Sequence, residues 1–369
     1  MELKKYTSKN KFIDSLMLFF TDIFFYSVRA ISRKRSGQNN KFLIISLHKI
    51  GDSVFTIPAI KEILKEFKDK EIFLLVLSET KVIFKEIIDG NYLYTVDKKE
   101  FKIGNRIASR KSRMLIKNID PDIIVDLTCT ITSAFLIFNS KSSRIVGTND
   151  RYFKNVYSDF INIRKVPHLI ELYTDVAELL LKRKVNQKLF EYALDFSKED
   201  PILIHPFAGW TAKEWDIKKY IWLAEQLSKN YRVSIIFHEN EASSETINYF
   251  VNAKIDFIKT KTLNDLINRI KNCSVFIGND SGPLYLANYY GKPTFTIYGP
   301  TNPDYSKPFG SFHRQVRKII DCSPVDTQYC FLSAGRECPS YQCMIQLDEN
   351  IVTEKIFKFI TDLEISTLQ

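Results

Sequence analysis

The chain has 369 residues, of which 45% are hydrophobic and 26% charged, and its formal net charge is +10. This composition is typical of a soluble globular protein, and the length favours two domains over one core. The positive charge indicates an anionic partner, such as a nucleic acid, a membrane surface or a phosphorylated substrate. Because lysine and arginine are spread through the chain and no nucleic-acid-binding motif is present, we expect no nucleic acid partner.

Residues 1–40 form an extension before the first predicted strand. The stretch from Phe12 to Val28 is rich in Phe and Leu, but Asp14 and Asp22 interrupt it and it is short for a membrane span. It lacks the small-residue cleavage site of a signal peptide, and basic residues follow it. Two interpretations stay open: a helix lying on an anionic membrane surface, and a helix packed on the protein itself.

The first half of the chain alternates strands and helices, which predicts a doubly wound parallel sheet. Its first strand, Lys41–Leu47, contains the unbroken apolar run FLII and leads into the loop HKIGDS and a helix. Gly51 and Asp52 therefore lie at the carboxyl edge of the sheet, where ligands of such folds bind. A carboxylate at a helix start is also an ordinary cap, so both roles stay open. Further strands are expected at 71–77, 92–96, 122–127 and 143–146. Helices are expected at 82–88, 103–118 and 169–181, and another helix follows the strand at 122–127 and ends at 138.

Two other polar residues of this half end or begin an element. Asp126 ends a predicted strand and is expected either to line the cleft or to cap the strand. His168 opens a long helix, and a lone histidine in that position is usually structural. Residues 182–200 are expected to connect the first domain to the second.

The second half begins a new sheet at Ile202–His205, followed by the loop PFAGWTAKEW. This loop places Lys213 near a helix start and a strand end, where a lysine suits a diphosphate, although a solvated lysine is the ordinary alternative. Asp216 is expected to cap the next helix. Beyond strand 231–237, Glu239 or Glu241 is a candidate to accept ribose hydroxyls, and a helix is expected at 262–270.

The stretch from Phe276 to Pro303 has the pattern strand, tight loop, short helix, turn and strand. Asp280 or Ser281 is expected to cap the helix, and Pro283 lies in its first turn. A glycine beside a helix N-terminus after a buried strand suits a phosphate, because the free amides and the helix dipole favour an anion. An ordinary turn that binds nothing is the alternative. After 308 the chain is expected to be irregular until a final helix at 351–360.

The six cysteines fall into two groups. Cys129 and Cys273 are expected to be core thiols. Four more cluster late in the chain, and without a secretion signal disulfides are not the first expectation. Their spacing is not that of paired C-x-x-C zinc motifs, so a metal site, a redox-labile or structural thiol cluster and plain reduced thiols stay open, and no metal ligand is assigned. The four are Cys322, Cys330, Cys338 and Cys343.

Taken together, three loops resemble the bacterial heptosyltransferases of glycosyltransferase family nine, which build the lipopolysaccharide core. That family has a Gly-Asp after its first strand and a proline six residues after the aspartate, which here is IISLHKIGDSVFTIPAI with Pro58. Its second motif corresponds to HPFAGWTAKEW, and its third to GNDSGPLYLA followed by YGPTNP. The motifs occur in the family's order, and the resemblance extends from Lys41 to the final helix.

The resemblance implies a GT-B architecture, with two Rossmann-like domains facing across a cleft and a C-terminal helix that crosses back to the first domain. Residues 41–185 would bind the acceptor, residues 186–348 the nucleotide-sugar, and residues 349–369 would form the last helix. The implied activity is metal-independent, inverting transfer of heptose from ADP-heptose to a lipid-linked anionic saccharide. The implied location is the cytoplasm, with peripheral contact to the inner membrane, and no cofactor beyond the donor is expected.

Inverting transfer needs a base for the acceptor hydroxyl and stabilisation of the departing diphosphate. By the resemblance, Asp52 is the base and Lys213 holds the diphosphate. The donor would also contact Asp280, Ser281, Gly282, Thr301 and, as a looser match, Glu241. The acceptor side would include Lys49, Gly51 and Asp126.

Two residues depart from the family pattern. Phe207 replaces a second small residue, and Tyr285 replaces a histidine that many members have. A glycosyltransferase that uses another nucleotide-sugar, with UDP or GDP, is therefore one alternative. A non-catalytic GT-B binding or scaffold protein at the membrane is another. A nucleotide-sugar epimerase would share the fold, but its acid/base cluster is not found.

Overall fold

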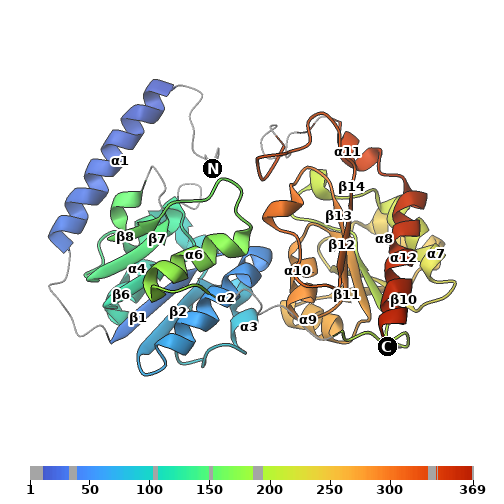
Figure 1. Ribbon diagram of the computed structural model, residues 1–369, viewed down its shortest axis with the longest axis horizontal. Coiled ribbons are helices and arrows are strands. Elements are labelled where there is room, and N and C mark those ends of the chain that lie inside the picture. Colours follow the sequence, from blue (N-terminus) through green and yellow to red (C-terminus); the bar gives the residue numbers. More distant parts are fainter. Residues whose placement is uncertain are drawn as a thin grey trace. The chain divides into compact units, whose positions relative to one another are not determined.

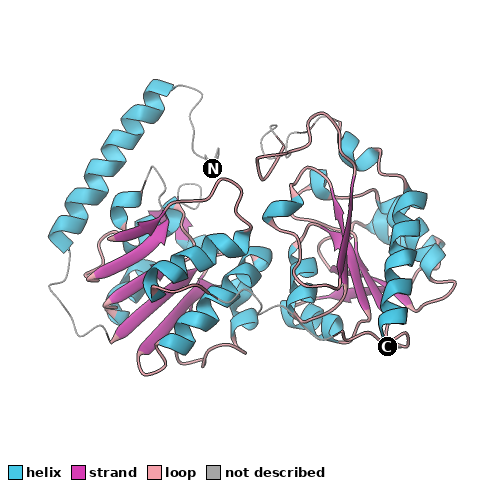
Figure 2. Ribbon diagram, in the orientation of Figure 1, coloured by secondary structure: helices cyan, strands magenta, loops and turns pink. Residues whose placement is uncertain are grey.

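The computed structural model describes residues 11–32, 40–102, 107–148, 153–185, 194–330, 338 and 340–367. The chain divides into two compact units, Met1–Gln187 and Lys188–Gln369 (Figure 1). Each unit is built on a six-stranded parallel sheet flanked by helices (Figure 2). The predicted fold class, two doubly wound α/β units, is therefore confirmed.

The sheet of the first unit has the order β3-β2-β1-β6-β7-β8, and all neighbouring strands are parallel. Its inner strands are continuous apolar runs because both faces of the sheet are covered. The strands are β1 (Lys41–Ser46), β2 (Glu71–Leu77), β3 (Leu93–Val96), β6 (Ile123–Asp126), β7 (Arg144–Thr148) and β8 (Asp159–Ile161).

The described residues of the first unit form six helices. Two of them, which contain the Gly-Asp motif and the His168 cap, pack closely on one another. His168 Nδ1 accepts a hydrogen bond from the amide of Ile170 at 3.2 Å, so the structural role predicted for this histidine is confirmed. The helices are α1 (Lys11–Ser32), α2 (Ile50–Glu66), α3 (Lys81–Phe84), α4 (Arg110–Ile119), α5 (Ile131–Ile137) and α6 (Leu169–Leu181), with short 3-10 turns at Ser78–Thr80, Lys98–Glu100 and Lys154–Val156.

Helix α1, in the extension, packs on the first unit through one of its faces. Phe25 is fully buried in the core of that unit, and its ring lies 5.3 Å from that of Phe135. Arg29 is also buried and donates to the carbonyls of Ser140 and Ser142 at 2.8 and 3.0 Å. Of the two interpretations of the extension, packing on the protein itself is thus observed for this face. Within the described residues, no helix has the length and apolar character needed to cross a bilayer.

The sheet of the second unit has the order β11-β10-β9-β12-β13-β14, again parallel throughout. The same crossover pattern as in the first unit reverses the strand order at one point, between β9 and β12. The strands are β9 (Ile202–His205), β10 (Val233–His238), β11 (Phe257–Thr260), β12 (Val275–Asn279), β13 (Thr294–Tyr298) and β14 (His313–Arg317).

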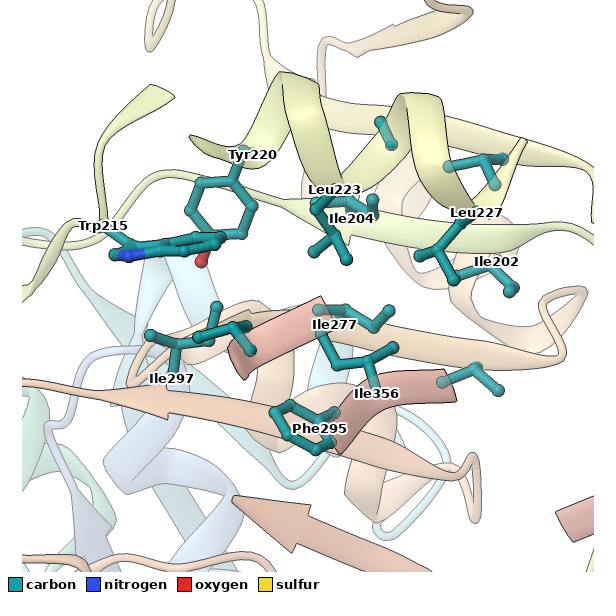
Figure 3. Packing of buried hydrophobic residues seen from close by; sticks show 14 of the residues in the cluster. Ile202, Ile204, Trp215, Tyr220, Leu223, Leu227, Ile277, Phe295, Ile297 and Ile356 are labelled. Carbon is teal, nitrogen blue, oxygen red and sulfur yellow. The ribbon is translucent and has the colours of Figure 1, made fainter. Parts of the chain in front are cut away.

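The helices of the second unit bury their apolar faces on this sheet. Figure 3 shows Tyr220, Leu223 and Leu227 of α7 facing Ile204 of β9 and Ile277 of β12 across one core. Asp216 accepts a hydrogen bond from the amide of Lys218 at 2.8 Å, which confirms the predicted cap of α7. The helices are α7 (Ile217–Leu227), α8 (Ser244–Asn252), α9 (Leu263–Lys271), α10 (Gly282–Tyr289), α11 (Gln342–Ile345) and α12 (Glu349–Thr367), with 3-10 turns at Thr211–Lys213 and Pro303–Tyr305.

The last helix, α12, packs on the second unit, and its crossing to the first domain stays a prediction. Its apolar residues Val352, Ile356, Phe359 and Ile360 are buried in the core of the second unit, where α12 packs against α7 and β14. The physical reason is the apolar stripe of α12, from Val352 to Leu363, which is buried in that core.

Two elements were misjudged from the sequence. The helix expected at 103–118 begins only at Arg110, because Ser109 caps it by accepting from the amide of Ser112 at 3.1 Å. Two described segments before the cap form a small antiparallel pair, β4 (Phe101–Lys102) and β5 (Ile107–Ala108). The chain after 308 was expected to be irregular, but HRQVR forms β14, an edge strand that needs little apolar surface.

Candidate donor and acceptor sites

In each unit, two loops of interest leave the carboxyl ends of the strands on either side of the point where the strand order reverses. In the first unit these loops follow β1 and β6, which are paired with Ile45 opposite Asp126. In the second they follow β9 and β12, with His205 opposite Gly278. Open α/β sheets bind their ligands at such switch points, because the two loops diverge there and leave a crevice.

The loop between β1 and α2 is fixed by the neighbouring strand. The amide of Leu47 donates to Thr128 Oγ1 at 2.8 Å, and His48 Nε2 lies 3.0 Å from the carbonyl of Leu127. At the start of α2, the amide of Ser53 donates to the carbonyl of Lys49 at 2.9 Å. These bonds hold the Gly-Asp motif in the first turn of α2.

Asp52 is half-buried and lies in that first helical turn, where the helix dipole favours a negative charge. Within the residues that the structure describes, its carboxylate has neither a hydrogen-bond donor nor a cation as partner. Both of its oxygens are thus open to an incoming hydroxyl group. Lys49 is exposed and Gly51 is half-buried beside it, so all three predicted residues share this loop.

Asp126 does not line a crevice, and this part of the prediction is wrong. It is fully buried at the end of β6 and accepts hydrogen bonds from the amides of Thr128 and Cys129 at 2.9 and 3.1 Å. The hydroxyl of Tyr157 donates to its other oxygen at 2.8 Å. Burial raises the pKa of Asp126. It therefore fills the capping role that the sequence left open.

In the second unit, Lys213 and Asp280 form a nearly buried ion pair. Lys213 Nζ lies 2.6 Å from Asp280 Oδ2, with the side chains 14% and 5% exposed. Burial pushes the pKa of Asp280 upward, but the charge and hydrogen bond of Lys213 outweigh it, and the pKa lies below its usual value. Lys213 also stands 5.2 Å above the ring of Trp210. The lysine ammonium is thus held in place before any ligand binds.

Ser281 lies directly before α10, at the N-cap position. Its side chain is 7% exposed, and Oγ has no hydrogen-bond partner in the described residues. It does not cap the helix, whose first residues are Gly282 and Pro283. A buried hydroxyl without a partner is rare, because leaving one unsatisfied costs about 1–3 kcal/mol. Together with the helix N-terminus, it forms a set of donors suited to an anion.

Asn279 joins the two loops and is not among the site residues predicted from the sequence. It is fully buried, and its Oδ1 accepts from the amide of Trp215 at 3.2 Å and from the hydroxyl of Tyr220 at 2.8 Å. Its Nδ2 donates to the carbonyl of Pro206 at 2.6 Å. The loop after β9 and the loop after β12 are therefore held together by one side chain. The signal was present, since this asparagine lies inside the GND motif.

Tyr285 is the second residue whose role the sequence did not assign. It is buried in α10, and its hydroxyl donates a short hydrogen bond to Asp280. The tyrosine that departs from the family's histidine thus still supports the carboxylate that holds Lys213. Burial raises the pKa of Tyr285 well above its usual value, so it stays a neutral donor.

Thr301 and Glu241 complete the predicted donor residues. Thr301 is buried next to Asp280, whose pKa it helps to lower, and its backbone forms an antiparallel bridge to Tyr329. Glu241 follows β10 and accepts from the amide of His238 at 2.7 Å. Burial pushes the pKa of Glu241 upward, but the neighbouring His205, 3.4 Å away, and that amide bring it below its usual value.

The four late cysteines converge although their spacing along the chain is irregular. Cys322, Cys330, Cys338 and Cys343 line one enclosed hollow of about 20 Å³ beside Gly299. Burial and the neighbouring sulfurs raise the pKa of Cys343 to about 11. Among the described side chains, no three potential metal ligands are arranged around a common point. Cys129 and Cys273 are buried thiols, as predicted.

Two doubly wound units with loops of this kind at their switch points match the GT-B fold. The family model described as glycosyltransferase family 9 (heptosyltransferase) matches residues 110–333. The chain belongs to this family and is a glycosyltransferase.

Individual relatives agree with this assignment. Lipooligosaccharide heptosyltransferase 2 of Campylobacter jejuni subsp. jejuni serotype O:6 is 26% identical over 329 residues, which cover 85% of this chain and 96% of the relative. The solved structure of E. coli ADP-heptose LPS heptosyltransferase II aligns with a TM-score of 0.66 and 19% identity, over 88% of this chain and 99% of that one. E. coli heptosyltransferase WaaC with ADP-2-deoxy-2-fluoro heptose gives 0.62 and 14%, over 86% and 99%. At these identities the structural likeness concerns the fold.

Proposed function

We propose that this glycosyltransferase moves heptose from ADP-heptose onto a lipid-linked, anionic saccharide of the lipopolysaccharide core type. The observation that carries the proposal is the preformed anion site of the second unit, where the Lys213–Asp280 pair and the unpartnered Ser281 hydroxyl stand at the N-terminus of α10. The names of the relatives, which are lipooligosaccharide and lipopolysaccharide heptosyltransferases, support the choice of sugar and acceptor.

The donor diphosphate would bind to this site. Lys213 provides a cation, Ser281 a hydroxyl donor, and Gly282 a backbone amide that a ligand can approach closely. Asp280 keeps the lysine in place and lowers the entropy lost when the diphosphate binds. Thr301 would line the same site, and Glu241 would accept a ribose hydroxyl through the oxygen that the His238 amide does not use.

Asp52 would serve as the general base in the first unit. In the reaction, the acceptor oxygen forms a bond to the anomeric carbon while the bond from that carbon to the diphosphate oxygen breaks, with inversion. Asp52 takes the proton of the acceptor hydroxyl, and the electron pair of the broken bond leaves with the diphosphate. Lys213 and the α10 amides stabilise the charge that develops on the leaving group. This chemistry needs no metal ion.

The experiment combines nucleotide binding with turnover. Calorimetry of the purified protein with ADP, UDP, GDP, CDP and ADP-heptose should show selective binding of ADP and ADP-heptose, and Lys213→Ala should weaken both. Asp52→Asn should remove turnover at unchanged donor affinity, whereas Asp69→Asn, an exposed aspartate after α2, should leave both unchanged.

Three results would contradict parts of the proposal. Selective binding of UDP or GDP would refute ADP-heptose as the donor and indicate that the enzyme builds another glycan. Near-normal turnover of Asp52→Asn would refute the base. Binding of no nucleotide would favour a scaffold protein.

We further propose peripheral contact with the cytoplasmic face of the inner membrane through α1. On the side of α1 that faces away from Phe25, Ile23 and Ile31 are 48% and 87% exposed. Ile23→Ser/Ile31→Ser should lower binding of the full chain to lipid vesicles at least about tenfold, because two buried isoleucines contribute about 3 kcal/mol. The matched control is Ile351→Ser/Ile365→Ser on α12, where both residues are 52% exposed. Equal loss in both variants would refute the contact.

A further inference from the structure

A second candidate site lies on the first unit, along α4. It is a hollow of about 540 Å³ between α4 and the turn that joins α5 to β7, and we call it the α4 groove. Pro121 and Lys141 in its lining lie before β6 and β7, at the amino edge of the sheet. Asp52 lies after β1, at the carboxyl edge. The α4 groove is therefore separate from the predicted acceptor loop.

Four cationic side chains line the α4 groove: Arg110, Arg113, Lys117 and Lys141. In the described part of the chain, none of the four forms an ion pair with a carboxylate.

The other face of α4 is different, because Lys111 pairs with Glu100 at 3.2 Å and does not line the groove. Asp120, at the end of α4, is the acidic residue of the lining. The four cations around the hollow repel one another, and one carboxylate does not neutralise them. The groove therefore favours the binding of an anion.

The groove adjoins helix α1, whose outer face we define by the exposed side chains of Ile23, Phe24 and Ile31. Arg29 of α1 donates to the carbonyl of Ser140, which is itself a lining residue of the groove. The ring of Phe24 lies 5.4 Å from that of Phe138. Phe138 directly precedes Asn139, which lines the groove. Phe24 is also 43% exposed, on the same side of α1 as Ile23 and Ile31. A helix with an exposed apolar face therefore packs beside the segment that borders the cationic groove.

We propose that the α4 groove binds the phosphate of an anionic phospholipid headgroup while the outer face of α1 enters the interfacial zone of the bilayer. Apolar and aromatic side chains next to unpaired cations match the two layers of an anionic membrane surface, acyl chains and phosphates. This proposal rests on the membrane contact proposed above and adds a specific headgroup site to it. A second copy of the chain is a poor occupant, because in a symmetric contact the four cations of one copy would face the same four cations of the other.

The experiment measures binding of the full chain to vesicles of phosphatidylcholine, with and without phosphatidylglycerol. Arg113→Gln/Lys117→Gln/Lys141→Gln should lose about a hundredfold in affinity for the anionic vesicles, since each cation near such a surface contributes about fivefold. Its affinity for phosphatidylcholine alone and for ADP should not change. Asp120→Asn should bind the anionic vesicles about fivefold more tightly.

Two matched controls separate a site from a net-charge effect. Lys111→Gln removes one charge from the same helix but outside the groove, and should have a much smaller effect than Lys117→Gln. Lys229→Gln/Lys355→Gln/Lys358→Gln removes three exposed charges from the second unit. If this control loses as much affinity as the groove variant, or if the groove variant keeps its affinity, the headgroup site is refuted.

Other outcomes identify which proposal fails. Displacement from anionic vesicles by millimolar glycerol phosphate would show that a soluble phosphate is the ligand and would refute the lipid. A change in oligomeric state of the groove variant in sedimentation would favour a contact between copies and also refute it. If Ile23→Ser/Ile31→Ser binds vesicles normally while the groove variant does not, the proposed membrane contact of α1 is refuted. The proposed headgroup site in the α4 groove is then supported.

Discussion

Replacing Asn279 by alanine should destabilise the second unit strongly, because this one buried side chain makes three hydrogen bonds, two to the loop after β9 and one to helix α7. The change leaves the amide of Trp215, the hydroxyl of Tyr220 and the carbonyl of Pro206 without their partner. An unsatisfied buried group costs about 1–3 kcal/mol, and relaxation recovers part of it, so we expect a loss of about 3–5 kcal/mol. Tyr220→Phe removes one of the bonds and should cost about 1 kcal/mol.

Urea unfolding followed by tryptophan fluorescence is the suitable assay, because all three tryptophans, at 210, 215 and 222, lie in the second unit. Asn272→Ala, at an exposed asparagine after α9, is the control and should change the free energy of unfolding by less than about 0.5 kcal/mol. In the Asn279→Ala background, Tyr220→Phe should cost almost nothing more. A loss below about 1 kcal/mol for Asn279→Ala, or full additivity of the two changes, would refute the reasoning.

Two further predictions concern close contacts and charge. Gly278→Ala places a Cβ 2.8 Å from a backbone carbonyl of β9 and should cost about 3 kcal/mol, whereas Gly299→Ala meets the flexible Met344 sulfur at 2.8 Å and should cost about 1 kcal/mol. Equal losses in urea unfolding would contradict this. Because the pKa of Asp280 is lowered in the folded protein, its contribution to stability is present above its unfolded pKa of about 3.9 and is lost as the pH falls through the folded value. The stability difference between wild type and Lys213→Met should thus be largest near neutral pH and shrink in acid, and a pH-independent difference would refute the pairing.

Local patterns were sufficient for most of the framework. Apolar runs such as Ile202–His205 and helix signals such as Asp216 and His168 predicted their elements well, because both depend on neighbouring residues only. Polar edge strands did not follow this rule. β14 forms because it pairs with the free edge of β13. The segment HRQVR itself carries no local signal of this pairing.

The sequence by itself determined which loops matter. Gly-Asp after β1, the lysine loop after β9 and the GNDSG turn after β12 stand out because glycine, a carboxylate and a helix start are local signals of a ligand site. The sequence also placed the strand end at Asp126, but it could not separate a buried cap from a residue of the crevice. That choice depends on Tyr157, which approaches Asp126 only in the folded unit.

Tertiary structure alone decided the contacts between residues far apart in the chain. The pairing of Lys213 with Asp280, the bridging by Asn279 and the convergence of four irregularly spaced cysteines all need the strand order of the second sheet. The same holds for α12, whose apolar stripe was visible but whose partner was not. A sequence states which surface is apolar or charged, while the free energy of packing that surface depends on what the fold brings against it.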